Sequence, residues 1–493
     1  MLTGKDVAAH NSAESLWIII HGKVYDLTEF APSHPGGMKI LLKYAGKDAT
    51  EEYDPIHPPG TIEGALSPDK HLGNVDASTL TPDQKVSEPA ANPTATRSDG
   101  PRSAAECLNL DDFERAAETR LKAKAWAYYR SAADDEKTYR WNTDAFSKIR
   151  FRPRVLRNVR PINLSTKVLG RAAKMPVFIS PAAMGRLAHP EGEKCLVRAA
   201  AANGIPYIVS SNSSVGLEDL AAETPEAMLF FQLYVNRERS KTEELLERVA
   251  KAGYKGICVT VDAPVAGKRE RDERTKLDED AALDLDTQAS VTRAPPDAPD
   301  GPQDQKTQGI AQSLGSYVDP TLSWEDLAWV QRAADGLPII VKGIQSAEDA
   351  ALAAHYGAAA IILSNHGGRQ LEGAPSCVET LLEIRRYEPQ VFEQVEVWCD
   401  GGFRRGTDVL KAIALGARCV GFGRSFMYSL VFGNSGPQRV ATILREELEQ
   451  NTRLLGATSL AEVVPAMVNP AALVRNVYAG PYDSPAKPVR AKL

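Results

Sequence analysis

The chain has 493 residues, of which 43% are hydrophobic and 25% charged, and its formal net charge at neutral pH is -6. This length exceeds what one hydrophobic core usually supports, so we expect two domains. The acidic balance and the lack of a basic run argue against nucleic-acid binding, and no apolar stretch approaches the roughly 18 residues that a membrane-spanning helix needs.

The N-terminal part, residues 1–76, contains two histidines beside proline and glycine. Residues 17–30, WIIIHGKVYDLTEF, predict two short strands around a His21-Gly22 turn. His34 follows in His34-Pro35-Gly36-Gly37, and His57 lies in His57-Pro58-Pro59-Gly60. Two imidazoles held in this way can occupy both axial positions of a haem iron, an arrangement that carries electrons and leaves no open site for O2. The alternative is that both are surface histidines beside turns.

Further features of residues 1–76 accompany the histidines: the strand pair, the apolar helix MKILLKYAG and the turn D-A-T-E. Together with H-P-G-G they resemble the cytochrome b5 family. The resemblance implies an α+β domain that binds haem b through His34 and His57. Lys and Arg in this segment number 6 against 11 Asp and Glu, a balance of -5. Such an acidic face steers a basic electron-transfer partner or merely aids solubility.

Two segments lack apolar periodicity. Residues 77–104, rich in Pro, Ser, Thr and Ala, predict a flexible linker before a second domain at 105–493. Within that domain, about residues 271–312 contain DEDAALDLD and APPDAPDGPQDQ and predict a mobile loop, because structureless stretches of this length are uncommon in compact domains.

Eight short apolar runs follow the linker, separated by segments compatible with helices. This order predicts an α/β domain built as a (β/α)8 TIM barrel, whose active site lies at the carboxyl ends of the strands. Each run ends at a polar residue or glycine, and the eight ends are Ser180, Ser210, Gln232, Thr260, Lys342, Ser364, Asp400 and Gly423. We therefore expect these residues to converge on one mouth.

The sixth run leads into S-N-H-G-G-R-Q, which places a histidine three residues from an arginine. His366 is suited to accept a proton near neutral pH. Arg369 can form two hydrogen bonds to a substrate carboxylate. Asp262, after the fourth run, can orient the imidazole, and Lys342 can stabilise a flavin that accepts electrons. The alternatives are that the glycines only form turns and that Lys342 is a surface charge.

The seventh and eighth runs end in glycine-rich segments with arginines. These are Asp400-Gly401-Gly402-Phe403-Arg404 and Gly421-Phe422-Gly423-Arg424. Because the loops after the last two strands of such barrels often bind phosphate, the segments predict a phosphate pocket.

Residues 108–480 resemble the FMN-dependent α-hydroxy-acid dehydrogenases and oxidases. The resemblance rests on AWAYYRSAADDE, PEGE, FQLYV, TVDAP, KG, SNHGGRQ, DGGFRRGTDVLKA and GFGRSF. With the N-terminal segment, the whole chain is similar to the flavocytochrome b2 family of cytochrome-linked L-lactate dehydrogenases. The resemblance implies that an L-2-hydroxy acid is oxidised to the 2-oxo acid, with electrons passing from FMN to haem b and on to an acceptor such as cytochrome c. It also implies a homotetramer.

The same resemblance implies roles for individual residues. His366, Asp262 and Tyr234 are implied to be catalytic, and Tyr128, Tyr234, Arg269 and Arg369 to bind substrate. The residues implied to hold FMN are Ser180, Pro181, Ala182, Ala183, Ser210, Gln232, Thr260, Lys342, Asp400, Gly401, Gly402, Arg404, Gly423 and Arg424.

Three positions depart from the family pattern. Ala182 stands where a threonine is usual beside the flavin, and Ala132 replaces a glycine. Asn212 occupies the position of a large apolar residue over the substrate side chain, so a longer or more polar 2-hydroxy acid than lactate is an alternative substrate. A further alternative is that Asn212 faces solvent.

Two other functional readings remain open from the sequence. An oxidase would deliver the electrons to O2 and produce hydrogen peroxide. A non-catalytic electron carrier would lack barrel chemistry, but His366, Arg369, Asp262 and Lys342 are all present and argue against it.

The cysteines and the C-terminus bear on the compartment. The six cysteines form no C-x-x-C pair and predict reduced core residues in a non-oxidising compartment. The last residues, Ala491-Lys492-Leu493, fit a peroxisomal address, and no N-terminal leader is evident. We expect a peroxisomal protein, with the cytoplasm and the mitochondrial intermembrane space as alternatives.

Overall fold

The structure is a computed structural model that describes residues 1–57, 60–81, 83–84, 100–275, 310 and 317–480. Contacts divide the chain into two compact units. The first comprises Met1–Ser98, Leu121–Tyr128 and Arg269–Leu314, and the second comprises Asp99–Arg120, Tyr129–Lys268 and Gly315–Leu493. The predicted linker at 77–104 and the predicted loop at 271–312 lie largely outside the described residues, although residues 270–275 are helical.

The first unit contains a four-stranded antiparallel sheet in the order β1-β2-β3-β4. The strands are β1 (Asn11–Ser12), β2 (Ser15–Ile20), β3 (Lys23–Asp26) and β4 (His71–Asn74). His21 and Gly22 form the turn between β2 and β3 with φ of +50° and +73°, as the sequence predicts. The helices are α1 (Gly4–Ala8), α2 (Met38–Lys43), α3 (Thr50–Tyr53) and α4 (Thr61–Ala65).

Strand β2 is apolar from Leu16 onward because the sheet is covered on both faces. Leu16, Ile18 and Ile20 pack into the main core of this unit. Ile19 points to the opposite face and packs into a second core with Val7, Val24 and Val75. Alternation along the strand therefore explains the uninterrupted run of isoleucines.

Contacts of this unit continue beyond residue 76. Gln84 is 5% exposed, and its Nε2 donates to the carbonyl oxygens of Gly4 at 2.7 Å and Gly46 at 3.1 Å. The beginning of the predicted linker is therefore packed on the N-terminal domain.

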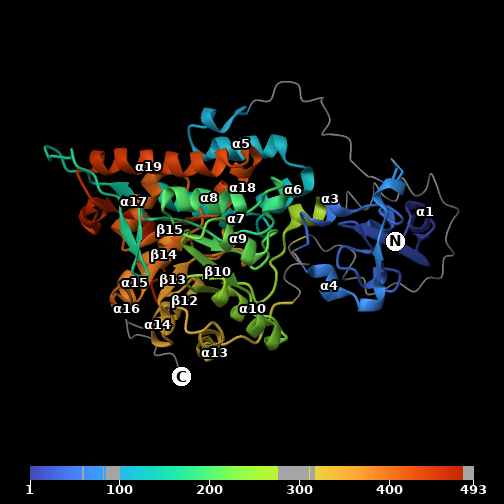
Figure 1. Cartoon of the computed structure of the whole chain (residues 1–493). Coiled ribbons are helices and arrows are strands. Elements are labelled where there is room, and N and C mark those ends of the chain that lie inside the picture. The colour runs from blue at the N-terminus through green and yellow to red at the C-terminus, as the bar shows by residue number, and fades with distance from the viewer. Residues whose placement is uncertain (58–59, 82, 85–99, 276–309, 311–316, 481–493) are drawn as a thin grey trace. The chain divides into compact units, whose positions relative to one another are not determined.

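The second unit is built on a closed parallel barrel in the order β10-β11-β12-β13-β14-β15-β8-β9 (Figure 1). All eight strands were predicted, and the expected (β/α)8 fold is confirmed. The strands are β8 (Val177–Ile179), β9 (Tyr207–Val209), β10 (Leu229–Leu233), β11 (Ile257–Thr260), β12 (Ile339–Ile344), β13 (Ala360–Leu363), β14 (Glu396–Asp400) and β15 (Cys419–Phe422).

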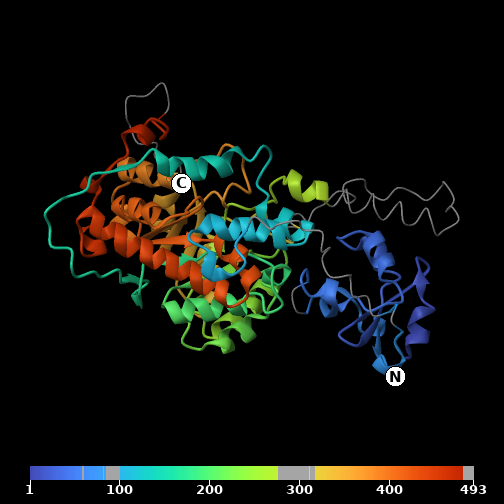
Figure 2. The same ribbon diagram turned by 90° about the horizontal axis from the view of Figure 1, so that it is seen from above.

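Helices surround these strands, and the long helix α19 (Ser435–Leu455) lies beside α17 and α8 (Figures 1 and 2). The helices that follow strands are α8 (Lys194–Asn203), α9 (Leu217–Glu223), α10 (Arg239–Lys251), α13 (Asp326–Ala333), α14 (Ala347–His355), α15 (Cys377–Tyr387), α16 (Val391–Gln394), α17 (Gly406–Ala414) and α18 (Arg424–Ser429). The additional helices are α5 (Leu110–Arg120), α6 (Ala123–Arg130), α7 (Lys137–Ser147) and α20 (Ala471–Val474).

A short hairpin closes the amino-terminal end of the barrel. It consists of β6 (Thr166–Val168) and β7 (Arg171–Ala173), and Val168 joins the apolar cluster of the barrel interior. The backbone N–H of Leu169 donates to Glu396, the first residue of β14, at 3.0 Å. A second pair, β5 (Arg150–Phe151) and β16 (Val468–Asn469), is antiparallel.

All six cysteines are buried and free of disulfides, which confirms the prediction that they are core residues. No helix among the described residues is long and apolar enough to cross a membrane.

Candidate active site

The polar residues at the strand ends form a layer directly above the apolar interior of the barrel. Because side chains alternate along a strand, a residue two positions after an inward-facing residue also faces inward. The apolar layer contains Phe178, Ile208, Phe230, Cys258, Ile340, Ile362 and Trp398. Two positions later in each strand come Ser180, Ser210, Gln232, Thr260, Lys342, Ser364 and Asp400, all buried. The convergence predicted from the sequence is thus explained by strand geometry.

His366 contacts two other residues predicted to be catalytic. Its Nδ1 lies 2.9 Å from Oδ1 of Asp262, and its Nε2 lies 3.4 Å from the hydroxyl of Tyr234. His366 has a left-handed backbone, with φ of +59°, which turns the ring out of the β13 direction. The arrangement leaves Nε2, on the Tyr234 side, as the nitrogen that can exchange a proton with a substrate.

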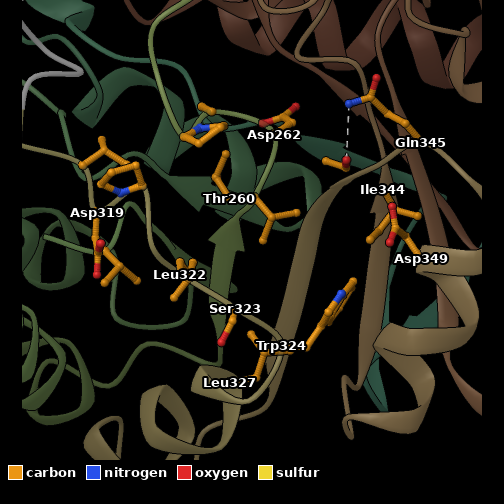
Figure 3. A pocket seen from close by; sticks show the side chains of 17 residues that line it. Thr260, Asp262, Asp319, Leu322, Ser323, Trp324, Leu327, Ile344, Gln345 and Asp349 are labelled. Atoms are coloured by element: carbon orange, nitrogen blue, oxygen red, sulfur yellow. Dashed lines mark hydrogen bonds between the residues drawn. The ribbon is translucent and has the colours of Figure 1, made fainter. Parts of the chain in front are cut away.

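Asp262 is ionised at neutral pH. Its side chain is completely buried, and burial by itself raises the pKa of a carboxyl group. The neighbouring His366 and Lys342 outweigh that effect, so the pKa of Asp262 is lowered. The carboxylate can therefore stabilise positive charge on the imidazole. Figure 3 shows Thr260 and Asp262 beside a cavity.

Lys342 is buried among polar groups. Its Nζ lies 3.2 Å from Oγ of Ser364 and 3.9 Å from Oδ2 of Asp400, which also accepts from Oγ of Ser180 at 3.2 Å. Burial lowers the pKa of Lys342, but the carboxylates of Asp400 and Asp262 outweigh this effect and the net pKa is raised. The barrel mouth therefore has a fixed positive charge, and the alternative of a surface lysine is excluded.

Three buried polar atoms of residues predicted to hold FMN have no hydrogen-bond partner among the described residues. They are Nε2 of Gln232, Oγ1 of Thr260 and Nη1 of Arg424. Buried polar groups are normally satisfied, so such atoms indicate a bound polar group. The uncharged amide of Gln232 and hydroxyl of Thr260 suit the flavin ring of FMN. The buried guanidinium of Arg424 suits its phosphate. The residues present therefore fit this cofactor.

The glycine-rich segments after β14 and β15 hold the arginines differently. Nη2 of Arg424 donates to the carbonyl oxygen of Gly367 at 2.5 Å, which directs this guanidinium toward the loop of His366. Arg404 instead pairs with Glu114 of α5 and donates to the hydroxyl of Tyr139 at 3.2 Å. Phosphate binding by Arg404 stays a prediction. It requires the guanidinium to bind the phosphate while it also pairs with the Glu114 carboxylate.

The remaining predicted cofactor residues also lie at this mouth. Gly401 and Gly402 have φ of +92° and +83°, and a Cβ on Gly402 would lie 2.3 Å from the carbonyl oxygen of Asn142. A side chain is therefore excluded at Gly402. Pro181, Ala182 and Ala183 form the half-buried segment after β8, and Gly423 precedes α18.

Arg369 is anchored by the backbone of a neighbouring segment. Its Nη1 donates to the carbonyl oxygens of Tyr129 at 2.8 Å and Ser131 at 3.0 Å. Asn365, in the same loop, exchanges hydrogen bonds of 2.8 and 2.7 Å with Asn142 of α7. These contacts fix the loop that carries His366 and Arg369.

Asn212 is held inside the protein by a residue that the sequence analysis did not identify. It is 7% exposed, and its Oδ1 accepts a hydrogen bond of 3.1 Å from the hydroxyl of Tyr317. The loop is also joined to the flavin-side residues, because Ser211 N donates to Oε1 of Gln232 at 3.2 Å. The alternative that Asn212 faces solvent is therefore wrong.

Two predicted substrate residues belong to the first unit. Tyr128, in α6, is 6% exposed, and Arg269, seven residues after Asp262, is 8% exposed. Both are thus buried within the structure, and their contact with substrate stays a prediction.

The two predicted haem ligands face each other in the first unit. The ring centroids of His34 and His57 are 6.1 Å apart with an interplanar angle of 34°. Nδ1 of His34 lies 3.2 Å from the carbonyl oxygen of Gly37, and Nδ1 of His57 lies 3.1 Å from that of Tyr53. Such bonds place the proton on Nδ1 and present Nε2 to a metal, as is usual for ligating histidines.

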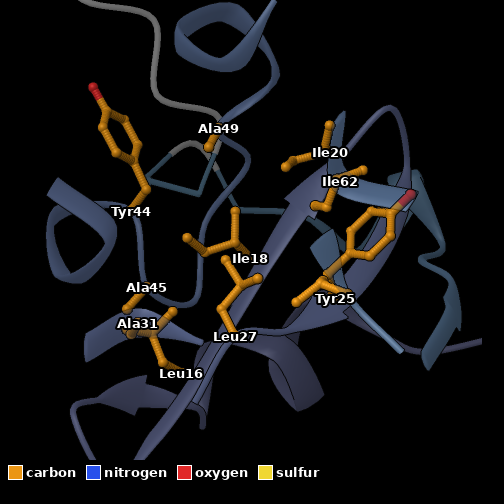
Figure 4. Packing of buried hydrophobic residues seen from close by; sticks show 11 residues of the cluster. Leu16, Ile18, Ile20, Tyr25, Leu27, Ala31, Tyr44, Ala45, Ala49 and Ile62 are labelled. Carbon is orange, nitrogen blue, oxygen red and sulfur yellow. The ribbon is translucent and has the colours of Figure 1, made fainter. Parts of the chain in front are cut away.

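The surroundings of these rings also suit haem. The separation leaves room for one ion with a bond of about 2 Å to each ring. Tyr53 stacks on His57 with centroids 4.3 Å apart, and burial lowers the pKa of His57 to about 4, which keeps the ligand neutral. The apolar cluster of this unit, including Ile18, Leu27 and Ile62, is shown in Figure 4. The residues therefore fit haem b.

The sequence analysis missed a buried carboxyl group between two active-site loops. Glu193 is 0% exposed, and its Oε1 accepts from the backbone N–H groups of Gly185 at 2.8 Å and Ser214 at 3.0 Å. It thereby joins the loop after β8 to the loop after β9, and burial raises its pKa. Its place in the motif PEGE was the only available signal.

Comparison with known proteins identifies both parts of the chain. Residues 117–470 match the FMN-dependent dehydrogenase family, and residues 3–76 match the cytochrome b5-like heme/steroid binding domain. An L-lactate dehydrogenase (cytochrome) of Wickerhamomyces anomalus is 38% identical over 472 residues, which cover 95% of this chain and 80% of that protein. Glycolate oxidase 3 of Oryza sativa subsp. indica is 42% identical over 356 residues, covering 72% of this chain and 94% of the relative.

A solved structure of a flavocytochrome b2 variant is also similar. It is 35% identical, with a TM-score of 0.66, and the match covers 77% of this chain and 91% of the other. The predicted resemblance, the two cofactors FMN and haem b, and the predicted enzyme class are confirmed by these matches. The chain belongs to the FMN-dependent dehydrogenase family and carries, at its N-terminus, a cytochrome b5-like haem domain.

Proposed function

We propose that this chain oxidises a small, lactate-like L-2-hydroxy acid to the 2-oxo acid at the barrel mouth. The main support is the pair of contacts made by His366: Nδ1 lies 2.9 Å from Asp262, and Nε2 lies 3.4 Å from the hydroxyl of Tyr234. FMN accepts the two electrons released by the substrate and haem b passes them on singly. A matched haem domain on the same chain supports this route.

Different side chains bind the substrate and accept its proton. Oxidation of the alcohol to a ketone releases two electrons and two protons; Nε2 of His366 takes one proton, and bound FMN would take up the two electrons and the other proton. Asp262 stabilises the imidazolium that results. Arg369 binds the substrate carboxylate, while Tyr234 positions the substrate. The same roles for Arg269 and Tyr128, which belong to the first unit, rest on the family resemblance alone.

Asn212 determines which 2-hydroxy acid fits. Because Oδ1 of Asn212 accepts from Tyr317, the amide N–H group is left to donate to the substrate side chain. An apolar methyl group would leave that donor unpaired at a cost of about 1–3 kcal/mol. The preferred substrate therefore has an oxygen acceptor in its side chain, and lactate is the smaller alternative.

An oxidase that reduces O2 is the second candidate, because the barrel is also similar to a glycolate oxidase. The haem domain favours the dehydrogenase. The test compares, in one preparation, the hydrogen peroxide formed under air with the reduction of added cytochrome c. Reduction of cytochrome c with little peroxide supports the dehydrogenase, and stoichiometric peroxide supports the oxidase.

The acceptor, assembly and compartment are further parts of this proposal. The balance of -5 over residues 1–76 favours a basic acceptor such as cytochrome c. A homotetramer is proposed from the family resemblance. Peroxisomal import is proposed from Ala491-Lys492-Leu493, which lie outside the described residues. An N-terminal fluorescent fusion imaged with and without Leu493 tests import, and identical diffuse signals from the two would reject it.

A further inference from the structure

One aromatic side chain connects the two arginines that are predicted to bind the phosphate of FMN. Tyr139 lies in the first turn of α7 and is half-buried. The guanidinium carbon of Arg424 lies 4.4 Å from the centroid of its ring. Its hydroxyl accepts a hydrogen bond of 3.2 Å from Nη2 of Arg404. Arg404 follows β14 and Arg424 begins α18, so a single tyrosine contacts arginines from two separate loops.

The contact with the ring matters for Arg424 because its charge is poorly compensated. Nη1 is buried without a hydrogen-bond partner, and Arg424 makes no ion pair with any described residue. Arg130 also lies over the Tyr139 ring, at 4.2 Å, but it pairs with Glu136 at 3.2 Å. An aromatic face attracts a guanidinium, and more strongly where water is excluded. The Tyr139 ring therefore stabilises Arg424 and helps to set its direction.

Arg404 is held by carboxylates as well as by the tyrosine. It pairs with Glu114 of α5, and its Nε lies 3.6 Å from Oδ1 of Asp111. The hydroxyl of Tyr139 donates to Oε1 of the same Glu114 at 3.4 Å. Because the hydroxyl proton points to this carboxylate, an oxygen lone pair is available to the Arg404 guanidinium. The hydroxyl thus helps to fix the direction of the Arg404 fork.

The position of Tyr139 is itself determined by the loop that carries His366. A Cβ on Gly368 would lie 2.6 Å from the backbone nitrogen of Tyr139, and φ at Gly368 is +75°. Asn142, one turn later in α7, exchanges hydrogen bonds with Asn365 in this loop. The close packing of α7 on the loop means that the tyrosine directs the arginines from a fixed support.

We propose that Tyr139 is a positioning residue for the phosphate of FMN, acting through Arg424 and Arg404. The inference rests on the FMN-dependent function proposed above and on the prediction that these two arginines bind the phosphate. Because the ring and hydroxyl direct both guanidiniums in advance, less side-chain freedom is lost when the phosphate binds. The benefit is specific to a flavin with a phosphate. A tyrosine that only packs against its neighbours would affect every flavin alike.

The test compares FMN with riboflavin, which has the same ring system without the phosphate. The full-length protein, freed of FMN and still containing haem, is titrated with each flavin, and quenching of flavin fluorescence gives Kd. Tyr139→Leu should weaken FMN binding about tenfold and riboflavin binding by less than about twofold, because a cation–π contact and a charge-assisted hydrogen bond are lost. Trp141→Leu, which removes an exposed ring from the same helix, should bind both flavins as the wild type does.

The conservative variant Tyr139→Phe keeps the ring on Arg424 and removes only the contacts of the hydroxyl. It should weaken FMN binding about threefold and leave riboflavin binding unchanged. This variant keeps the aromatic volume, so it decides the question if the leucine variant does not fold. Unchanged FMN affinity in Tyr139→Phe would overturn the proposal, as would an equal loss for the two flavins in Tyr139→Leu.

A third variant, Arg424→Ala, separates the positioning role from the phosphate assignment. It should weaken FMN binding selectively, and the loss in Tyr139→Leu/Arg424→Ala should be smaller than the product of the two single losses, because Tyr139 acts partly through Arg424. No selective loss in Arg424→Ala would overturn the phosphate site and the proposal with it. A selective loss there, with losses that simply multiply in the double variant, would overturn the positioning role alone. Neither result depends on the oxidation of a hydroxy acid, since no substrate is present.

Discussion

The backbone of Gly343 lies directly against the side chain of Asp262. A Cβ on Gly343 would lie 2.7 Å from both Cβ and Cγ of Asp262, and φ at Gly343 is +113°. The register between β12 and β13 shifts between Lys342 and Ile344, so Gly343 is the irregular residue of its strand. The glycine thus allows Lys342 and the carboxylate that serves His366 to lie side by side at the mouth.

We expect Gly343→Ala to slow FMN reduction and to destabilise the protein by about 1–3 kcal/mol, through a strained backbone and overpacking. The rate of flavin bleaching at saturating substrate and the thermal midpoint measure these effects. Gly336→Ala is the matched control, because φ there is +74° but nothing lies within 4 Å of its Cβ position. Equal rates of flavin reduction in the two variants would show that contact with Asp262 is unimportant.

Replacement of His366 by glutamine should leave FMN bound and reduce its rate of reduction by about 10²–10⁴-fold, because glutamine cannot accept the proton. The visible absorption of the flavin measures cofactor content, and anaerobic stopped-flow mixing measures the rate. His355→Gln, at an exposed position on α14, should behave as wild type. A wild-type rate in His366→Gln would remove this residue from the reaction.

Alanine at His34 or His57 should abolish the low-spin haem spectrum without loss of FMN, since iron then lacks one axial nitrogen. Absorption spectra of the purified variants give both cofactor contents. His71→Ala, which alters an exposed histidine of the same unit, should retain the haem spectrum. An unchanged Soret band in the double variant His34→Ala/His57→Ala would refute the ligand assignment.

Substitution of Asn212 by leucine should shift preference toward apolar 2-hydroxy acids, because the amide donor is removed. Tyr317→Phe should shift it less, since the amide remains but loses its 3.1 Å hydrogen bond. The measurement is kcat/KM for a panel of L-2-hydroxy acids that differ in side-chain length and polarity. An unchanged ranking in Asn212→Leu would place the residue outside the substrate pocket.

The sequence predicts much of this site because strand alternation is regular. Phe178 and Ser180, or Ile340 and Lys342, are two residues apart, so recognising the strands also predicts the inward-facing polar layer. The haem histidines are similarly marked by adjacent proline and glycine. In both cases the signal is local, which is why a single sequence reveals it.

Contacts between distant segments could not be predicted in the same way. Asn142 and Asn365 are 223 positions apart, and Tyr317 is 105 positions from Asn212. No local pattern pairs such residues, since their contact depends on how the loops pack. The close approach of Gly343 to Asp262 likewise depends on the φ angle of Gly343, which the sequence Lys342-Gly343 does not specify.

In the proposed reaction, electrons from a 2-hydroxy acid pass through FMN to the haem of the same chain. Anaerobic stopped-flow mixing of the full chain with L-lactate, followed at flavin and haem wavelengths, tests it most directly. We expect bleaching of FMN followed by reduction of haem in the wild type, and bleaching of FMN alone in His57→Ala. Complete reduction of FMN with a haem that stays oxidised in the wild type would contradict it.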